Sequence, residues 1–341
     1  MKRVKTILIY LITLAIAGGL FWYAYRDTDF SKMLQDMKTV NYNWIILSLA
    51  LAILSHIIRA YRWQLLLKPL GFHVNLLRSF LAVMVGYFAN ILVPRMGEVT
   101  RCGILKRTDN VSIPSSFGTV VGERLIDLLC LLIIVVSTLI IEFEVINEYF
   151  FGFFEDKLAI LGRNLLLVYM LAAFGLVMLL VFFIFLKPIK QKVKSWPIYL
   201  KVREFLREVG TGIATIGKVD DKLAFLVSTV LIWALYYAMS YVVVFSLEET
   251  SGLSLLAGLS ILTMGSLGIS APVQGGIGTY HILVASVLVT YGISDEIAKL
   301  YAALMHSAQI LMIVVVGGIS FLLSIFISRR KNRENAAKLH G

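Results

Sequence analysis

Two short stretches of this sequence decide the fold, because each interrupts a long apolar segment in the same way. Residues 90–98 read Asn90-Ile91-Leu92-Val93-Pro94-Arg95-Met96-Gly97-Glu98, and residues 268–276 read Gly268-Ile269-Ser270-Ala271-Pro272-Val273-Gln274-Gly275-Gly276. In both, a glycine follows a proline by three residues. Proline breaks a helix because it has no backbone N–H to donate. We therefore expect a helical hairpin at each stretch, over about residues 75–105 and 253–291.

The composition around these breaks is that of a membrane protein. The chain has 341 residues, of which 59% are hydrophobic and 16% charged, and its mean hydropathy is +0.84. Apolar runs long enough to cross a bilayer predict six full spans, at Thr6–Tyr25, Trp44–Leu67, Ser115–Ile141, Leu165–Leu186, Leu223–Leu247 and Tyr301–Ile327. We interpret the first run as an uncleaved span, because it is too long for a signal peptide.

The charge of the loops orients these spans, since cytoplasmic loops collect Lys and Arg. Residues 187–222 carry nine basic and four acidic residues, whereas residues 142–163 carry two basic and five acidic ones. All basic loops lie in the cytoplasm, and all acidic loops outside, only if each interrupted segment returns to the side of the membrane from which it entered. The prediction is an all-α polytopic membrane protein, N-in and C-in, with six full spans and two re-entrant helical hairpins in an inverted pseudo-repeat.

The chain is expected to form one transmembrane domain over residues 1–328, followed by a basic cytoplasmic tail at 329–341. Apolar residues at helical spacing predict a cytoplasmic amphipathic helix over about residues 198–217. The net charge of +11 indicates anionic membrane lipid as the partner, not nucleic acid, because basic loops explain it. A homo-oligomer is left open. The two cysteines stand in no metal-binding spacing, so no metal and no cofactor are expected.

The two hairpin tips are the candidate binding site. Broken helices that meet near the bilayer midplane mark the site in transporters built from inverted repeats. The helix that begins after each break has unpaired N–H groups, which favour an anion. Arg95 and Arg101 flank the first tip, and the glycines of the second tip allow close approach to the backbone. His281 follows the second tip and is the histidine best placed to take part.

Charged residues inside the spans are the second signal. Glu123, Arg124 and Asp127 lie near the middle of one span, where each charge costs at least ~2.5 kcal/mol. Either an ion pair that holds helices together or a polar path for a headgroup would explain them, and the sequence leaves both open. Arg59 and Arg62 share a face of the second span. We expect Arg59 to contact lipid phosphate and Arg62 to reach the membrane surface by snorkelling.

Four motifs occur in order along the chain: Arg59-x-x-Arg62-Trp63, then Asn90-x-x-x-Pro94-Arg95-x-Gly97-Glu98-x-x-Arg101, then Glu123-Arg124-x-x-Asp127, and last Pro272-x-x-Gly275-Gly276-Ile277-Gly278. Together they resemble the lysylphosphatidylglycerol synthase transmembrane family, the flippase-like half of the multiple peptide resistance factor. The resemblance covers nearly the whole chain. It implies a flippase-like fold with the motif residues in the translocation core. We expect Gln274 and His281 there as well, because of their positions at and just after the second tip.

Two positions depart from that family. It usually has Pro-Gly-Gly where this chain has Gln274-Gly275-Gly276, and Glu where this chain has His281. An imidazole thus replaces a carboxylate suited to a cationic aminoacyl-lipid, so a lysylated lipid is not the expected substrate. The soluble aminoacyl-transferase domain of the full-length synthase is also not in this sequence, so synthesis of lysyl-lipid is not expected.

The expected function is therefore translocation of an anionic (phospho)lipid headgroup across the bacterial inner membrane, by a multi-pass protein that is not an enzyme and has no catalytic residues. Two alternatives stay open. One is a membrane-embedded transferase acting on lipid-linked substrates, which no H-x-x-x-H or G-x-S-x-G pattern supports. The other is a small-anion or ion-coupled secondary transporter on the same inverted-repeat scaffold.

Overall fold

The computed structural model describes residues 2–93, 96–143, 207–271 and 273–340, and the side chains of residues 2–13 and 332–340 are not included. Within these ranges every regular element is a helix. Several predictions lie outside the described residues: the span at Leu165–Leu186, the first part of the amphipathic helix, and the tip residues Pro94, Arg95 and Pro272.

Within the described ranges, four helices are long and apolar enough to cross a membrane. They are α3 (Tyr42–Leu67), α6 (Ile113–Ile141), α10 (Lys222–Tyr241) and α13 (Asp295–His340). The short 3-10 turns η1 (Lys68–Leu70) and η3 (Val242–Ser246) extend α3 and α10. These four helices coincide with four of the predicted spans. Residues 2–25 also form a helix, α1 (Lys2–Tyr25), followed by α2 (Phe30–Asp36), but its crossing of the membrane stays a prediction.

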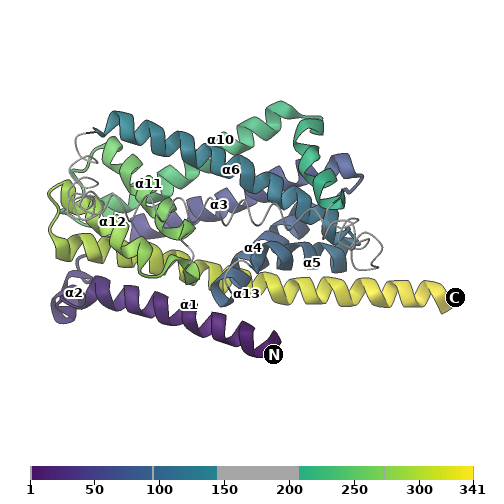
Figure 1. Ribbon diagram of the computed structural model, residues 1–341, viewed down its shortest axis with the longest axis horizontal. Coiled ribbons are helices and arrows are strands. Elements are labelled where there is room, and N and C mark those ends of the chain that lie inside the picture. Colours follow the sequence, from purple (N-terminus) through teal and green to yellow (C-terminus); the bar gives the residue numbers. More distant parts are fainter. Residues whose placement is uncertain (1, 94–95, 144–206, 272, 341) are drawn as a thin grey trace, which may run out of the picture.

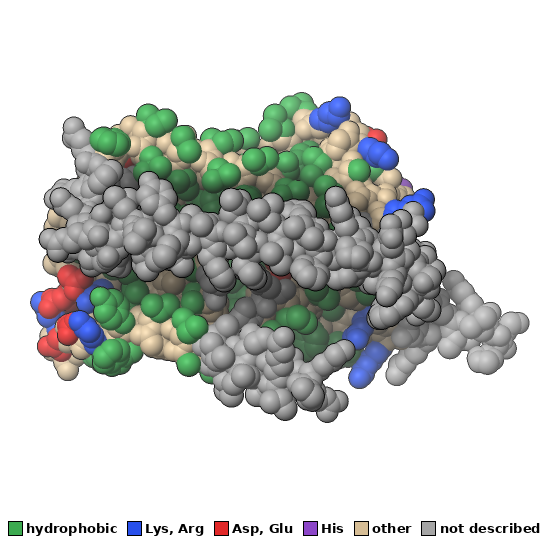
Figure 2. Space-filling model, in the orientation of Figure 1, with side chains coloured by type: hydrophobic (Ala, Val, Ile, Leu, Met, Phe, Trp, Pro, Cys, Tyr) green, Lys and Arg blue, Asp and Glu red, His purple; other side chains and the backbone are tan. Residues whose placement is uncertain are grey.

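The long helices present apolar side chains to the outside. Ile133 on α6, Leu223 on α10 and Phe326 on α13 are 66%, 71% and 68% exposed. Such a surface suits lipid, because hydrocarbon chains can cover it as water cannot. Figure 2 shows hydrophobic side chains on both sides of the grey, undescribed residues and charged side chains at the two ends of the molecule.

Two pairs of shorter helices form the predicted hairpins. The first pair is α4 (Leu76–Leu92) and α5 (Gly97–Asp109), and the second is α11 (Leu255–Ser270) and α12 (Thr279–Thr290). The 17 residues of α4 rise only about 25 Å at 1.5 Å per residue, less than the ~30 Å hydrocarbon core. The helices break where the sequence predicts, and the 3-10 turn η4 (Gln274–Gly276) lies at the second break.

Glycines let the two helices of each hairpin pack closely. A Cβ at Gly86 of α4 would lie 3.0 Å from the backbone oxygen of Gly97 at the start of α5. In the second hairpin a Cβ at Gly268 of α11 would lie 2.7 Å from Cα of Tyr280 on α12. Neither position has room for a side chain. Small residues at helix crossings serve the same purpose in membrane proteins generally.

The order long, short, short, long occurs twice, as α3–α4–α5–α6 and as α10–α11–α12–α13. The packing between the two sets is reciprocal. The first helices, α3 and α10, pack on each other; the second helix of each set packs on the fourth helix of the other, as α4 on α13 and α11 on α6. The two hairpins lie toward opposite ends of the long axis (Figure 1).

The segment before α10 and the C-terminal part of α13 lie outside this repeated order. Residues 207–214 are helical and η2 (Thr215–Lys218) follows. This segment packs tightly on α6, because a Cβ at Gly118 would lie 2.7 Å from Cα of Gly212. At the other end of the chain, α13 continues through the predicted basic tail to His340. The tail has neither proline nor glycine between residues 319 and 340, so nothing in it ends the helix.

Candidate functional site

Three helices each direct a pair of charged side chains into one buried cluster. Arg59 and Arg62 are three residues apart on α3, Glu98 and Arg101 are three apart on α5, and Glu123 and Asp127 are four apart on α6. Residues at these spacings lie on the same face of a helix. Arg124 of α6 joins the cluster beside them. We call these four arginines and three carboxylates the charge cluster: Arg59, Arg62, Glu98, Arg101, Glu123, Arg124 and Asp127.

Glu123 is the centre of the charge cluster. Its side chain is fully buried. Arg59 Nη1 lies 2.5 Å from one of its oxygens and Arg101 Nη2 lies 2.5 Å from the other, and Arg62 Nη2 is 3.5 Å away. One carboxylate therefore links an arginine of α3 to an arginine of α5.

Asp127, one turn further along α6, takes the remaining contacts. Arg59 Nη1 lies 2.8 Å from Asp127 Oδ2, and Arg62 Nη2 lies 2.7 Å from Oδ1. Arg124 Nη1 is 3.7 Å from Oδ2, a contact that residues three apart on one helix can make. Arg62 is fully buried in this contact, so its predicted snorkelling to the membrane surface is wrong.

Neutral groups complete the contacts of the arginines. Arg59 Nη2 donates to the Tyr236 hydroxyl at 2.9 Å, and Arg62 Nη1 donates to Thr229 Oγ1 at 3.2 Å. The Arg101 guanidinium lies over the Trp63 ring, 4.1 Å from its centroid, where the ring face attracts a cation. Buried charges are tolerated only when they are paired and hydrogen-bonded. The pairing of the charge cluster thus fixes α3, α5, α6 and α10 in one arrangement.

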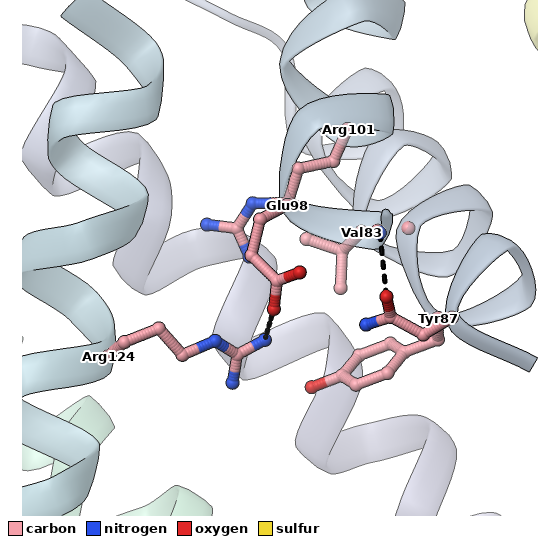
Figure 3. Close-up of a pocket in the computed structure, with 8 residues that line it drawn as sticks. Val83, Tyr87, Glu98, Arg101 and Arg124 are labelled. Carbon is pink, nitrogen blue, oxygen red and sulfur yellow. Dashed lines mark hydrogen bonds and ion pairs between the residues drawn. The ribbon is translucent and has the colours of Figure 1, made fainter. Parts of the chain in front are cut away.

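A narrow pocket borders the charge cluster where α4, α5 and α6 meet. It is lined by Val83, Gly86, Tyr87, Asn90, Gly97, Glu98, Arg101 and Arg124. Its volume of about 10 Å³ holds about one water molecule. Figure 3 shows the Glu98 side chain reaching from α5 toward Arg124 of α6, and Glu98 Oε1 lies 3.4 Å from Arg124 Nη2. The predicted residues of the first tip that are described, Asn90, Gly97, Glu98 and Arg101, all line this pocket.

The second tip is built without charge. The His281 and His306 rings lie 4.7 Å apart, and His306 stacks on Tyr280 at the same separation. His306 Nε2 is 2.9 Å from the carbonyl oxygen of Gly275. Gly275, Gly276 and Gly278 all have φ between +60° and +86°, a backbone region that glycine adopts most readily.

Each tip supplies a side chain to the first N–H groups of the helix that follows it. Asn90 Oδ1 accepts from the Gly97 N–H at 2.6 Å, and His281 Nδ1 accepts from the Gly278 N–H at 3.2 Å. The expectation that these N–H groups are unpaired and wait for an anion is therefore wrong for Gly97 and Gly278. At both positions a side chain of the protein itself accepts the hydrogen bond.

The two tips touch each other. Gln274 Nε2 of η4 donates to the carbonyl oxygens of Ile91 at 2.6 Å and of Leu92 at 3.3 Å, at the end of α4. Gln274 thus caps α4, whose last carbonyl groups have no partner within the helix. The predicted residues therefore fall into two neighbouring groups, one around the charge cluster and one around the glycines, and Gln274 joins them.

Sequence reasoning missed several residues of the site. Tyr236 and Thr229 hold the arginines from α10, Tyr87 and Gly86 line the pocket, and His306 contacts the second tip. Nothing in their local sequence distinguishes them from other polar or small residues of a span. For metals, the described side chains contain no group of three or more His, Cys, Asp or Glu residues placed around one point.

Comparison with known proteins gives a match over most of the chain. The model of the family described as "Lysylphosphatidylglycerol synthase TM region" matches residues 10–317. A UPF0104 membrane protein of Methanocaldococcus jannaschii is 32% identical over 129 residues, 37% of this chain and 36% of that protein. A second UPF0104 membrane protein, from Pyrococcus horikoshii, is 26% identical over 129 residues, 37% of each chain.

The chain aligns with only part of each relative. The aligned part is little more than a third of the length of each curated relative, 36% and 37%. No solved structure matches the chain. Both relatives are named as membrane proteins, without an activity.

Proposed function

Because the chain belongs to the lysylphosphatidylglycerol synthase transmembrane family, we propose that it moves an anionic phospholipid headgroup between the two leaflets of the bilayer. The observation that carries this proposal is the position of the charge cluster. Five of its seven side chains are buried, and it borders a pocket lined by Glu98, Arg101 and Arg124. Charges placed this deep in an apolar bundle mark ion or substrate pathways in membrane proteins.

The charges also favour an anion over a cation. The charge cluster contains four arginines and three carboxylates, so it has one positive charge in excess at neutral pH. Arginine binds phosphate with two parallel hydrogen bonds, which suits it to a phospholipid headgroup. The acyl chains would stay in the lipid, against the exposed apolar side chains of the long helices.

We propose that the two hairpins are re-entrant and enter from opposite sides. The end of the molecule toward which α5 lies carries mostly basic side chains, and the opposite end, near α2, mixes acidic and basic ones (Figures 1 and 2). The basic end would lie in the cytoplasm. This gives the N-in and C-in topology and the inverted repeat, and we infer the inner (cytoplasmic) membrane as the location. The contact between the tips through Gln274 supports this arrangement.

The test is headgroup translocation by the purified protein in vesicles of phosphatidylcholine that contain a trace of phosphatidylglycerol with a fluorescent headgroup. Dithionite, which does not cross the membrane, quenches only the outer leaflet, about half of the signal. Translocation would expose nearly all of it within the time of the assay. Protein-free vesicles are the control, and the assay is run with and without a proton gradient.

Three outcomes would change the assignment. Quenching that stops at the level of protein-free vesicles, with and without the gradient, would reject lipid translocation. Turnover of radiolabelled phosphatidylglycerol into a new lipid would instead indicate the transferase. Accumulation of radiolabelled phosphate inside the vesicles without movement of lipid would indicate the small-anion transporter.

A further inference from the structure

One arginine of the charge cluster differs from the other three. Arg59, Arg62 and Arg101 are at most 3% exposed, and each has a carboxylate oxygen within 2.5–2.8 Å. Arg124 is 39% exposed, and its carboxylate contacts are longer, at 3.4 Å to Glu98 and 3.7 Å to Asp127. A guanidinium has five N–H donors. Among the described residues Arg124 is therefore the arginine of the charge cluster that is held least tightly.

Glu98, the nearest partner of Arg124, is also incompletely bound. Its Oε2 atom is buried and has no hydrogen-bond partner among the described residues, and the same is true of Arg101 Nε. Both side chains line the pocket, and Arg101 is only 3% exposed. A buried polar atom without a partner costs about 1–3 kcal/mol. The side chains that line the pocket thus include one donor, Arg101 Nε, and one acceptor, Glu98 Oε2, without a hydrogen-bond partner among the described residues.

The size of the pocket decides how a ligand could enter. A volume of about 10 Å³ accepts a water molecule but not a phosphate group. A phosphate could reach Arg124 only if the Glu98 carboxylate moved away. Because the Glu98 side chain is 25% exposed, it can turn toward the opening without becoming an unpaired charge inside the protein. A carboxylate and a phosphate both present two oxygens to a guanidinium in the same plane.

We propose that Glu98 occupies the phosphate site of the empty protein, and that a lipid phosphodiester displaces it from Arg124. This inference rests on the proposed function and deepens it by naming the residue that binds substrate. Arg124 donates to the phosphate oxygens, and Arg101 Nε provides a further donor. Arg59 and Arg62 hold the helices together and do not touch the ligand.

The test is binding of dihexanoyl phosphatidylglycerol to the full-length protein in detergent, measured by isothermal titration calorimetry. Arg124→Ala removes a charged donor pair and is expected to weaken binding at least about tenfold. Glu98→Gln removes the competing charge and is expected to tighten binding about two- to fivefold, the equivalent of a half-exposed ion pair. The two variants should thus change the affinity in opposite directions. If Glu98 were only structural, its substitution would not tighten binding.

Arg78→Ala is the matched control. Arg78 pairs with Asp109 at 2.7 Å and is 43% exposed, so the variant removes an arginine of similar exposure outside the pocket, and its affinity should equal that of the wild type. If Arg124→Ala does not fold, Arg124→Lys replaces it in the test, because lysine keeps the positive charge. It should bind with intermediate affinity, because an ammonium lacks the paired donors of a guanidinium. Size-exclusion profiles show which variants are folded.

The outcomes separate this inference from the proposed function. Wild-type affinity in both Glu98→Gln and an Arg124 variant would overturn the displacement, even if vesicle translocation succeeds. Lipid binding with the expected changes, but without translocation, would support the site and reject the transport. Inorganic phosphate is titrated in parallel; affinity equal to that of the short-chain lipid would assign the site to a free anion and overturn a lipid headgroup as its ligand.

Discussion

The two hairpins share one backbone plan and differ completely in charge. Residues 75–109 of the first contain seven charged residues, and residues 253–294 of the second contain none. In each, nevertheless, the first helix ends two residues before a proline and crosses the second helix at a glycine. Each also bonds the first N–H of its second helix region to a side chain, Asn90 in one and His281 in the other. Charge is therefore not needed to build such a hairpin. The charges of the first hairpin therefore need an explanation other than the hairpin's backbone.

The largest effect should come from the centre of the charge cluster. Glu123→Ala removes the closest carboxylate of Arg59 and of Arg101 and leaves buried positive charge without compensation. We expect a loss of about 3–5 kcal/mol in the free energy of unfolding, measured by denaturant titration in detergent. Glu296→Ala, which breaks an exposed pair with Lys32, should cost less than about 1 kcal/mol. Equal losses in the two variants would mean that the charge cluster does not stabilise the first hairpin.

A smaller effect is expected in the second hairpin, which contains no charged residue between positions 253 and 294. Gly268→Ala places a methyl group 2.7 Å from Cα of Tyr280, and overpacking of this kind costs about 1–3 kcal/mol. Gly103→Ala on α5 is the matched control, because a Cβ there meets nothing within 4 Å. It should be neutral or stabilising by about 0.5–1 kcal/mol, since alanine favours helix over glycine. The free energies of unfolding of both variants are measured by denaturant titration in detergent. Destabilisation by Gly103→Ala would mean that close packing does not explain the loss in Gly268→Ala.

The smallest effect should come from the contact that joins the hairpins. Gln274→Ala removes the donor to Ile91 and Leu92, at an expected cost of about 1 kcal/mol. Hydrogen exchange at residues 91–93 should become faster, because the end of α4 loses its cap. Gln309→Ala, which loses only a weak contact to Met305 within α13, should leave this exchange unchanged. Exchange in Gln274→Ala that matches the wild type would show that the tips hold their positions without Gln274.

The helices and their breaks could be predicted because they depend on local signals. Apolar runs of sufficient length place α3 and α6 within two residues of their observed starts, and Pro94, Gly97 and Pro272 mark the tips. The pairing of Arg124 with Asp127 was also predictable, because three residues of helix bring them together. All of these signals act within a few positions of one chain segment.

The partners of the charge cluster were not predictable, because they come from distant segments. Arg59 and Glu123 are separated by 64 positions, and no local pattern states that α3 meets α6. The prediction for Arg62 was wrong for the same reason. An arginine near the end of a membrane helix usually extends to the membrane surface, and the sequence does not show that Asp127 of α6 lies close enough to pair with a buried Arg62. The bond from Gln274 to α4 joins positions 183 residues apart.

The length of α13 has a mechanical consequence. Its 46 residues extend about 70 Å, more than twice the ~30 Å hydrocarbon core. Along this length α13 packs on α12 and on α4, and Lys331 near its far end donates to the carbonyl oxygen of Thr108 at 2.8 Å. Because one continuous helix contacts α12, α4 and α5, any tilt of α12 that moved α13 would also move the first hairpin.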